Sequence, residues 1–317
     1  MKIHKTSIVI SSLVICAFLA GCAPVSAPVD TRQQSSSSEA EVSSVETTTG
    51  SALTEEPEEA HDISVMSYNI AGYSKTDDAH KKAIESGILK LRPDIAVINE
   101  GDAGLCSDSA QLTEIYDAVV PTFNGSITES VVLINKDKFS KLSEETYCLT
   151  ATPTEYSKVA GSYHYRFMTA VKLEHKATGK QFYVIATHLE NNSSNPDAFK
   201  RRDSARKLQA KFLLALIDQK LDASLPFIIA GDLNSSDDTT DQYRKGGISE
   251  LLASGRVENS SAVAATVKPG GYSHVSGITL DHILLSRGSF AVKMYSVEQS
   301  DTPPSDHHPV IAVVELK

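Results

Sequence analysis

The chain has 317 residues, which is long enough for one sizeable domain with a full hydrophobic core. Its formal net charge at pH 7 is −10, with 40 acidic side chains against 30 lysines and arginines. This balance argues against a broad basic surface for nucleic acid, although bound metal ions can offset negative charge locally.

Residues 1–22 have the features of a bacterial export signal. Lys2 and Lys5 give a positive start, and the apolar run at 7–20 is shorter than the about 20 residues that a membrane-spanning helix needs. The run ends in Leu19-Ala20-Gly21-Cys22, which resembles the lipobox of bacterial lipoproteins. We therefore expect Cys22 to carry a lipid anchor on the extracytoplasmic face of the cell membrane. The alternative is an ordinary signal peptide with an incidental cysteine.

Residues 23–60 are rich in serine, threonine and glutamate and contain almost no large apolar side chains. Such a segment buries too little surface to offset its ordering entropy, so we expect a disordered tether. The alternative is that it packs on the domain that follows, residues 61–317. That domain keeps Cys106 and Cys148, which could form a disulfide or remain buried thiols.

Predicted strands and helices alternate along residues 61–317. Residues 62–68 alternate polar and apolar side chains, as a half-buried strand does, and a helix runs from Asp77-Asp78 to Arg92-Pro93, where proline ends it. Another long helix begins at Asn195-Pro196, with an apolar face made of Ala205, Leu208, Phe212, Leu216 and Ile217. Further strands are predicted at 95–98, 130–134, 169–173, 182–186, 227–230, 280–285 and 310–314. This pattern predicts an α/β domain of two packed sheets with helices outside.

Polar side chains stand at the ends of these predicted strands. They are Asn69, Glu100, His188, Asp232, Asn234, Asp281, Asp306 and His307. Each has an ordinary explanation on its own: Asp232 after a glycine could cap a turn, and His188 could be a hydrogen-bonded core histidine. Because the same arrangement recurs six times, we interpret the set as a functional site at the rim of a sheet.

The segments that carry these residues resemble, in order, the motifs of the endonuclease/exonuclease/phosphatase family. They are Ser67-Tyr68-Asn69, Ile98-Asn99-Glu100, Thr187-His188-Leu189, Gly231-Asp232-Leu233-Asn234, Leu280-Asp281-His282-Ile283-Leu284 and Ser305-Asp306-His307-His308-Pro309-Val310. The resemblance implies a four-layer αββα sandwich like that of DNase I, with two mixed sheets flanked by helices. It also implies hydrolysis of a phosphoester by in-line attack of water. One departure is Asn99, where the family usually has glutamine.

The resemblance and the side-chain chemistry together suggest a metal site and a general base. Mg²⁺ and Mn²⁺ favour oxygen ligands, so Glu100 is the first expected ligand, with Asn69 beside it and Asp306 as a further candidate. His307 is expected to deprotonate the attacking water, because an imidazole titrates near neutral pH.

The remaining residues are expected to bind the phosphoryl group. Asp232 and Asn234, two positions apart and so on one side of an extended backbone, are expected to orient water and a phosphoryl oxygen. His188 is expected to hydrogen-bond that oxygen or protonate the leaving group, and the resemblance implies that Asp281 supports it. Arg166 matches a family arginine that contacts phosphate, with a plain strand-edge charge as an equal alternative. A weaker match implies that Glu129 orients His307.

The resemblance does not name the substrate. Asp102 stands where DNase I-like enzymes place an arginine for the minor groove, and the absence of tryptophan disfavours an abasic-site pocket. We favour an extracellular nuclease, and the alternative is a sphingomyelinase-like or other lipid or inositol phosphoesterase, for which no apolar membrane hairpin is obvious. A third interpretation is a binding lipoprotein that lost catalysis, against which the retained Glu100 and His307 argue. No segment indicates a protein partner.

Overall fold

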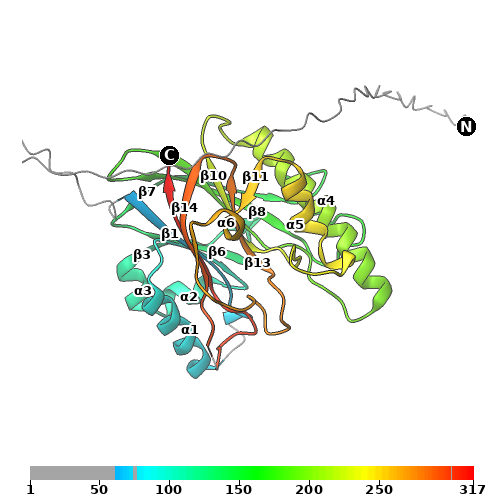
Figure 1. Ribbon diagram of the computed structural model, residues 1–317, viewed down its shortest axis with the longest axis horizontal. Helices are drawn as coiled ribbons and strands as arrows, with labels where there is room; N and C mark the ends of the chain where they lie inside the picture. The colour runs from blue at the N-terminus through cyan, green and yellow to red at the C-terminus, as the bar shows by residue number, and fades with distance from the viewer. Residues whose placement is uncertain (1–60, 74–76, 301) are drawn as a thin grey trace, which may run out of the picture. The chain divides into compact units, whose positions relative to one another are not determined.

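The computed structural model describes residues 61–73, 77–300 and 302–317. The predicted export signal, Cys22 and the predicted tether lie outside the described residues. No helix in the described ranges is both long and apolar enough to cross a membrane. The described domain has the predicted α/β architecture, with two large sheets and helices on their outer faces (Figure 1).

The first sheet is mixed. Its strands are β1 (Asp62–Asn69), β2 (Ile95–Asn99), β3 (Tyr116–Val119), β6 (Ser130–Asn135), β12 (Thr266–Val267), β14 (Phe290–Val297) and β15 (Val310–Leu316). Their spatial order is β12-β14-β15-β1-β2-β6-β3. β1 lies parallel to β2 and antiparallel to β15, so the last residues of β1 and β2, Asn69 and Asn99, are paired at one edge.

The second sheet is also mixed. Its strands are β7 (Phe139–Cys148), β8 (Phe167–His175), β9 (Gln181–Thr187), β10 (Phe227–Asp232), β11 (Val257–Asn259) and β13 (Asp281–Ser286), in the order β11-β13-β10-β9-β8-β7. β9 and β10 are parallel, and β13 pairs antiparallel with β10 so that Asp281 lies opposite Asp232. A separate small hairpin is formed by β4 (Thr122–Phe123) and β5 (Ser126–Ile127).

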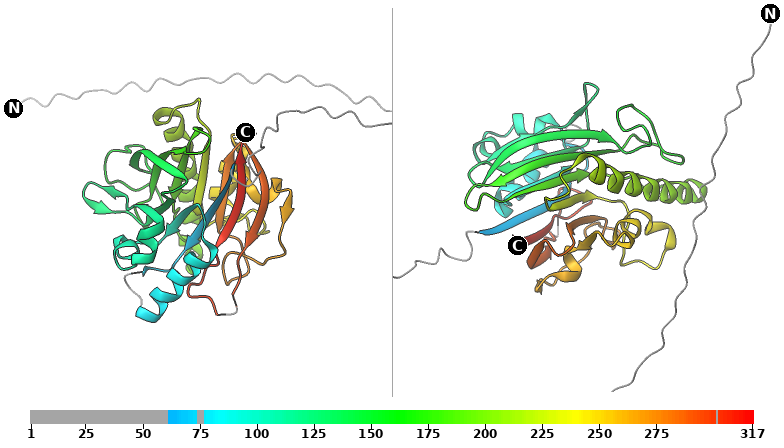
Figure 2. Two further views of the ribbon diagram at one scale, coloured as in Figure 1. Left: turned by 90° about the vertical axis from the view of Figure 1, so that its left-hand side faces the viewer. Right: turned by 90° about the horizontal axis from the view of Figure 1, so that it is seen from above.

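Three apolar clusters hold together the sheets and helices whose ribbons are drawn in Figure 2. The inner faces of the two sheets meet in a core of mainly β-branched and aromatic side chains, such as Val65 and Ile228. On the outer face of the first sheet lie α1 (Asp78–Leu91), α2 (Ala103–Ser107) and α3 (Ala110–Ile115). On the outer face of the second lie α4 (Pro196–Lys220) and α5 (Gly246–Ala253), while η3 (Gln242–Arg244) and α6 (Ser260–Val263) are short connections. The expected αββα layering is thus confirmed.

The two long helices begin where the sequence predicts. Asp77 caps α1 by accepting a hydrogen bond from the backbone amide of His80, and Asn195 caps α4 in the same manner. The predicted apolar face of α4 is only partly right. Leu208 is 36% exposed, and the first half of the buried face is polar, with Asp203, Arg206 and Gln209.

Candidate active site

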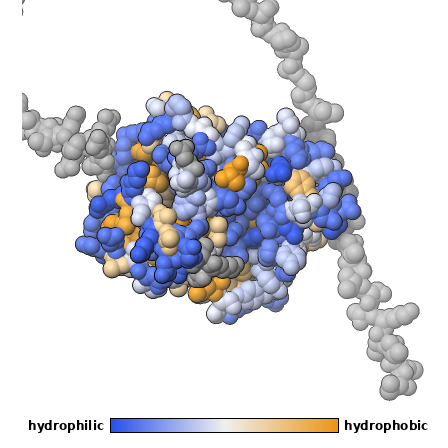
Figure 3. Space-filling view, turned by 90° about the horizontal axis from the view of Figure 1, so that it is seen from below, coloured by the Kyte–Doolittle hydropathy of each residue, from blue (hydrophilic) through white to orange (hydrophobic). Residues whose placement is uncertain are grey.

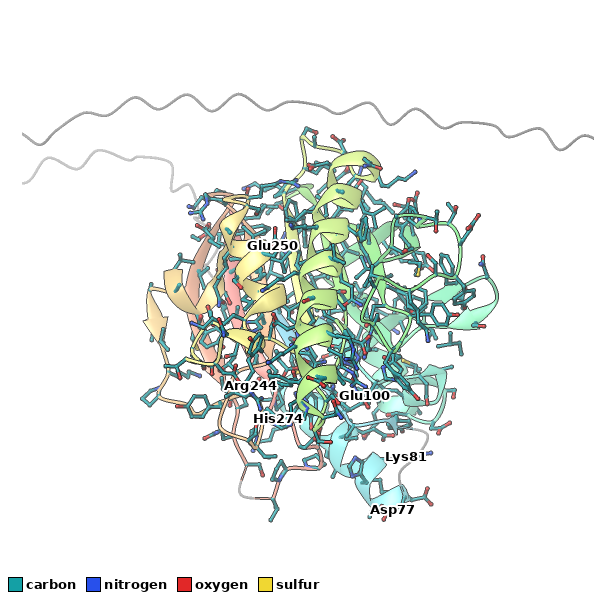
Figure 4. All side chains as sticks on the ribbon, turned by 90° about the vertical axis from the view of Figure 1, so that its right-hand side faces the viewer. Asp77, Lys81, Glu100, Arg244, Glu250 and His274 are labelled. Carbon is teal, nitrogen blue, oxygen red and sulfur yellow. The ribbon has the colours of Figure 1, made fainter. Side chains whose placement is uncertain are left out.

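Strand ends from both sheets bring most of the predicted residues to one cavity. β1 and β2 in the first sheet, and β9 and β10 in the second, end at the rim of a cavity of about 400 Å³. Its walls include Asn69, Glu100, His188, Asn191, Asn192, Asp232, Asn234, Arg244, His274, Asp306 and His307. Figure 4 shows Glu100, Arg244 and His274 around one end of the long helix α4. Arg166 and Asp281 are buried behind this wall rather than part of it.

His307 is paired with Asp281. Its Nδ1 lies 2.6 Å from Asp281 Oδ2, and its Nε2 lies 3.8 Å from Asp232 Oδ2. Burial favours the neutral ring, but the carboxylates, that of Asp281 foremost, raise the pKa of His307 to about 10. The ring is therefore protonated at neutral pH when no cation offsets the nearby negative charge.

His188 is paired with a different carboxylate. Its Nδ1 lies 3.2 Å from Glu129 Oε2, and its Nε2 lies 3.5 Å from Asp232 Oδ2. The sequence interpretation paired Asp281 with His188 and Glu129 with His307, and both pairings are wrong. Asp281 is the cross-strand neighbour of Asp232 and lies under the loop that carries His307, whereas Glu129 directly precedes β6 on the other sheet.

Asn69, Glu100 and Asp232 form a polar cluster at the base of the cavity. The amide nitrogen of Asn69 donates to Glu100 Oε1 at 3.2 Å and to Asp232 Oδ2 at 3.0 Å, while its oxygen accepts from the backbone of Ala71. Asn69 thus orients two carboxylates through its donor. Its role as a metal ligand, which needs the oxygen to face the cavity, stays a prediction.

Asn234 reaches the cavity by a turn and not by an extended strand. β10 ends at Asp232, whose Oδ1 accepts from the backbone amide of Asn234 at 2.8 Å, and Asn234 has a left-handed φ of 48°. Its side-chain nitrogen lies 3.1 Å from Nε2 of His188. The two residues do share the cavity wall, but the predicted reason, alternation in a strand, is wrong.

Asn99, noted in the sequence only as a departure from the family pattern, joins the two sheets beneath the cavity. Its nitrogen donates to Ser130 Oγ at 2.8 Å and to the carbonyl of Thr187 at 3.0 Å, and its oxygen accepts from the backbone amide of Asp232 at 2.7 Å. Gly231 allows this close approach, because a Cβ there would overlap the Thr187 carbonyl oxygen.

Arg166 is buried and lies next to two carboxylates. It does not line the cavity, whereas the predicted contact with phosphate requires that it does. Its guanidinium donates to Glu129 Oε2 at 2.7 Å, and its Nε lies 3.8 Å from Oε2 of Glu190. Glu190 is fully buried, accepts from Ser162 Oγ at 2.5 Å and has a lowered pKa: burial opposes the charge, but Ser162 and Arg166 favour it. Sequence reasoning missed Glu190, although it stands only two positions after His188.

A second group of possible ligand atoms lies among the residues of the cavity wall. His274, Asp306 and His307 each offer one ligand atom within 4.8 Å of the others, and His274 Nε2 lies 3.6 Å from Asp306 Oδ2. Asp306 lies in the loop before β15. His274 belongs to an irregular loop, and no strand-end pattern in the sequence singles it out.

The composition of the cavity wall fits a divalent cation. Glu100, Asp232 and Asp306 supply three carboxylates, whereas Arg244 is the one lysine or arginine among the wall residues. Oxygen donors with excess negative charge are the environment that Mg²⁺ and Mn²⁺ favour. Cys106 and Cys148 are free thiols, so the disulfide that the sequence left open is not formed.

Comparisons with known proteins identify the family and the fold. The model of the endonuclease/exonuclease/phosphatase family matches residues 66–307. A search of curated proteins gave no match. Among solved structures, a family member from Bacteroides thetaiotaomicron superposes with a TM-score of 0.67 at 20% identity, covering 81% of this chain and 98% of that one.

Two other solved structures are similar in fold. The mannosyl-6-phosphatase of Bacteroides thetaiotaomicron has a TM-score of 0.62 at 19% identity and covers 80% of this chain and 99% of its own. The catalytic domain of human Nocturnin, with bound sulfate, has a TM-score of 0.61 at 22% identity and covers 81% and 94%. Together with the ordered motifs at one cavity, the family match establishes that the chain belongs to the endonuclease/exonuclease/phosphatase family.

Proposed function

We propose that the protein is a divalent-metal-dependent phosphoesterase that hydrolyses a phosphodiester by in-line attack of water. One observation carries this proposal. Two histidines, His188 and His307, each have a carboxylate behind Nδ1, and their Nε2 atoms lie 3.5 and 3.8 Å from Oδ2 of Asp232 in a cavity that also contains Glu100. Such a cavity can supply a base, an acid and a cation site to one phosphorus atom.

The side chains divide the proton transfers between them. His307 Nε2 accepts a proton from water as its oxygen bonds to phosphorus, and Asp281 stabilises the imidazolium that results. His188, oriented by Glu129, donates a proton to the oxygen that leaves as the phosphorus–oxygen ester bond breaks. Asn234 hydrogen-bonds a phosphoryl oxygen through its amide.

The metal site is proposed at Glu100, with Asp306 and Asn69 as further ligands. A bound Mg²⁺ or Mn²⁺ would supply Lewis-acid stabilisation of the phosphoryl oxygens. Positive charge there also favours the neutral form of His307, because it opposes the carboxylates that hold the proton on the ring.

Hydrolysis of bis-p-nitrophenyl phosphate by the purified protein tests the proposal. The metal-stripped protein should be inactive, should gain activity with Mg²⁺ or Mn²⁺, and should lose it again in EDTA. Activity that survives excess EDTA would contradict the metal mechanism. His307→Ala serves as the matched inactive variant under the same conditions.

For the natural substrate we propose a nucleic acid, and a lipid phosphoester is the alternative. The described residues give this alternative little support: the small β4–β5 hairpin exposes Ile127, and the face in Figure 3 is mostly hydrophilic with small hydrophobic patches. The similarity in fold to a mannosyl-6-phosphatase supports a phosphoester but not its class. A panel of plasmid DNA, RNA, sphingomyelin and inositol phosphates separates these classes.

We also propose, from the sequence of residues 1–22, that the protein is exported and held at the extracytoplasmic face of the cell membrane by lipid on Cys22. Cys22→Ser should move the protein from the membrane fraction to the soluble fraction. An unchanged distribution would contradict lipidation at this residue.

A further inference from the structure

A strip of exposed aromatic rings and cationic side chains adjoins the catalytic cavity. Tyr163 and Tyr165, in the loop before β8, are 64% and 42% exposed. The ammonium of Lys158 lies 4.8 Å from the Tyr165 ring centre and 5.7 Å from that of Tyr163. The guanidinium of Arg202, in the first turns of α4, lies 5.3 Å from the Tyr163 ring centre. We call these four residues the aromatic strip.

The aromatic strip is joined to the cavity wall by hydrogen bonds. Arg202 donates to Oδ1 of Asn191 and to the carbonyl of Asn192, both at 2.6 Å, and both asparagines line the cavity. Arg202 is 16% exposed and its Nε lies 3.9 Å from Oε1 of the buried Glu190, so it holds Tyr163 beside the cavity wall.

The same alternation of rings and cations continues on α4 and η3. Lys200 lies 5.2 Å from the ring centre of Tyr243, and Arg244, a cavity residue, lies 5.3 Å from that of Phe199. Asp241, 3.6 Å from Arg244, offsets part of this charge. Cations and rings therefore extend well beyond the reach of a single phosphoryl group.

This composition fits one kind of ligand best. Exposed tyrosines offer faces on which bases stack, and interleaved lysine and arginine side chains follow a phosphate backbone. A lipid bilayer would instead favour contiguous apolar side chains, and the rings here are surrounded by charges. Duplex DNA keeps its bases stacked on each other, so it cannot use exposed ring faces in this way.

We propose that the aromatic strip binds a single-stranded nucleic acid whose scissile phosphodiester lies in the catalytic cavity. This inference rests on the proposed phosphoesterase function and adds to it the substrate class and the surface that selects it. Tyr163 and Tyr165 stack on bases, the exposed Lys158 contacts a phosphate that flanks the cleaved bond, and Arg202 fixes the position of Tyr163 next to the cavity.

The test is the binding of a fluorescein-labelled oligothymidylate to the metal-stripped protein in EDTA, measured by anisotropy. Loss of one stacked base costs about 1–3 kcal/mol, so Tyr163→Ala should bind at least about fivefold more weakly. Lys158→Gln should reduce the slope of log affinity against log salt by about 0.7. Tyr165→Ala provides an independent variant at the second ring.

Lys220→Gln is the matched control. Lys220 lies 5.8 Å from the Tyr147 ring centre at the other end of α4, about 27 Å along the helix from Arg202. Its substitution should leave the affinity for the oligothymidylate unchanged. The control thus removes a cation–ring contact of the same kind at a position far from the cavity.

Three results would overturn the inference. They are no binding of the oligothymidylate by the wild type, equal binding by the wild type and both tyrosine variants, and binding only to sphingomyelin vesicles. The proposed function is tested separately by wild-type hydrolysis of bis-p-nitrophenyl phosphate. Strip-dependent binding without that hydrolysis would contradict the phosphoesterase but support the strip as a nucleic-acid site.

Discussion

Replacing Asn99 with alanine should destabilise the protein strongly, because its amide joins the two sheets under the active site. The side chain is fully buried and serves three partners: the Ser130 hydroxyl, the Thr187 carbonyl and the Asp232 backbone amide. Each buried polar group left without a partner costs about 1–3 kcal/mol. With three groups affected, the free energy of unfolding should fall by about 3 kcal/mol or more.

Urea denaturation followed by far-ultraviolet circular dichroism measures this loss, since the chain has no tryptophan for fluorescence. Asn135→Ala is the matched control, because the Asn135 side chain accepts one exposed hydrogen bond from the amide of Asp137. It should cost less than about 1 kcal/mol. If Asn99→Ala is destabilised as little as this control, the joint between the sheets does not have the role described. Turnover by Asn99→Ala should also fall, because Asp232 loses its anchor.

The remaining predictions concern charge. Glu100→Gln should raise the Mg²⁺ concentration that gives half-maximal hydrolysis at least about tenfold, since it removes the main ligand charge; an unchanged titration refutes the assignment. The pKa of His307 is raised to about 10, because the attraction of Asp281 outweighs the opposing effect of burial. Protonation of His307 therefore stabilises the metal-free fold fully below pH 6.5, and this stabilisation declines as the pH rises toward 10. Denaturation series should therefore show the advantage of wild type over His307→Gln shrinking from pH 6.5 to 10, and a growing advantage would reverse the sign. Glu190→Gln should lower the free energy of unfolding by about 3 kcal/mol, because the buried guanidinium of Arg166 loses the charge of a neighbouring carboxylate. Urea denaturation measures this loss, with Glu144→Gln at an exposed position as the control. Equal losses in the two variants would refute the prediction.

The sequence predicted the location of the site better than its internal connections. Strand ends are visible as apolar runs that stop at a polar residue, so Glu100, His188 and Asp232 could be expected at one rim. Which carboxylate lies behind which histidine depends on contacts between distant segments. Glu129 and His188 are 59 positions apart and adjoin strands of different sheets, so no local pattern determines their pairing.

Elements without a regular pattern were also missed. β7 is an edge strand whose middle residues are exposed, so it shows no alternation of buried side chains. β14 contains a bulge between Val292 and Met294, which shifts its alternation midway. α5 begins with Gly246 and Gly247, residues that normally end helices, because side chains there would collide with Asp203 and Leu189.

The position of a bound cation tests the central claim most directly. Crystals of the protein grown with Mn²⁺ should show an anomalous-scattering peak about 2.1 Å from a carboxylate oxygen of Glu100. The same peak should be absent in Glu100→Gln. A peak confined to the cluster of His274, Asp306 and His307, with none beside Glu100, would contradict the proposed metal site and the arrangement of base and acid built around it.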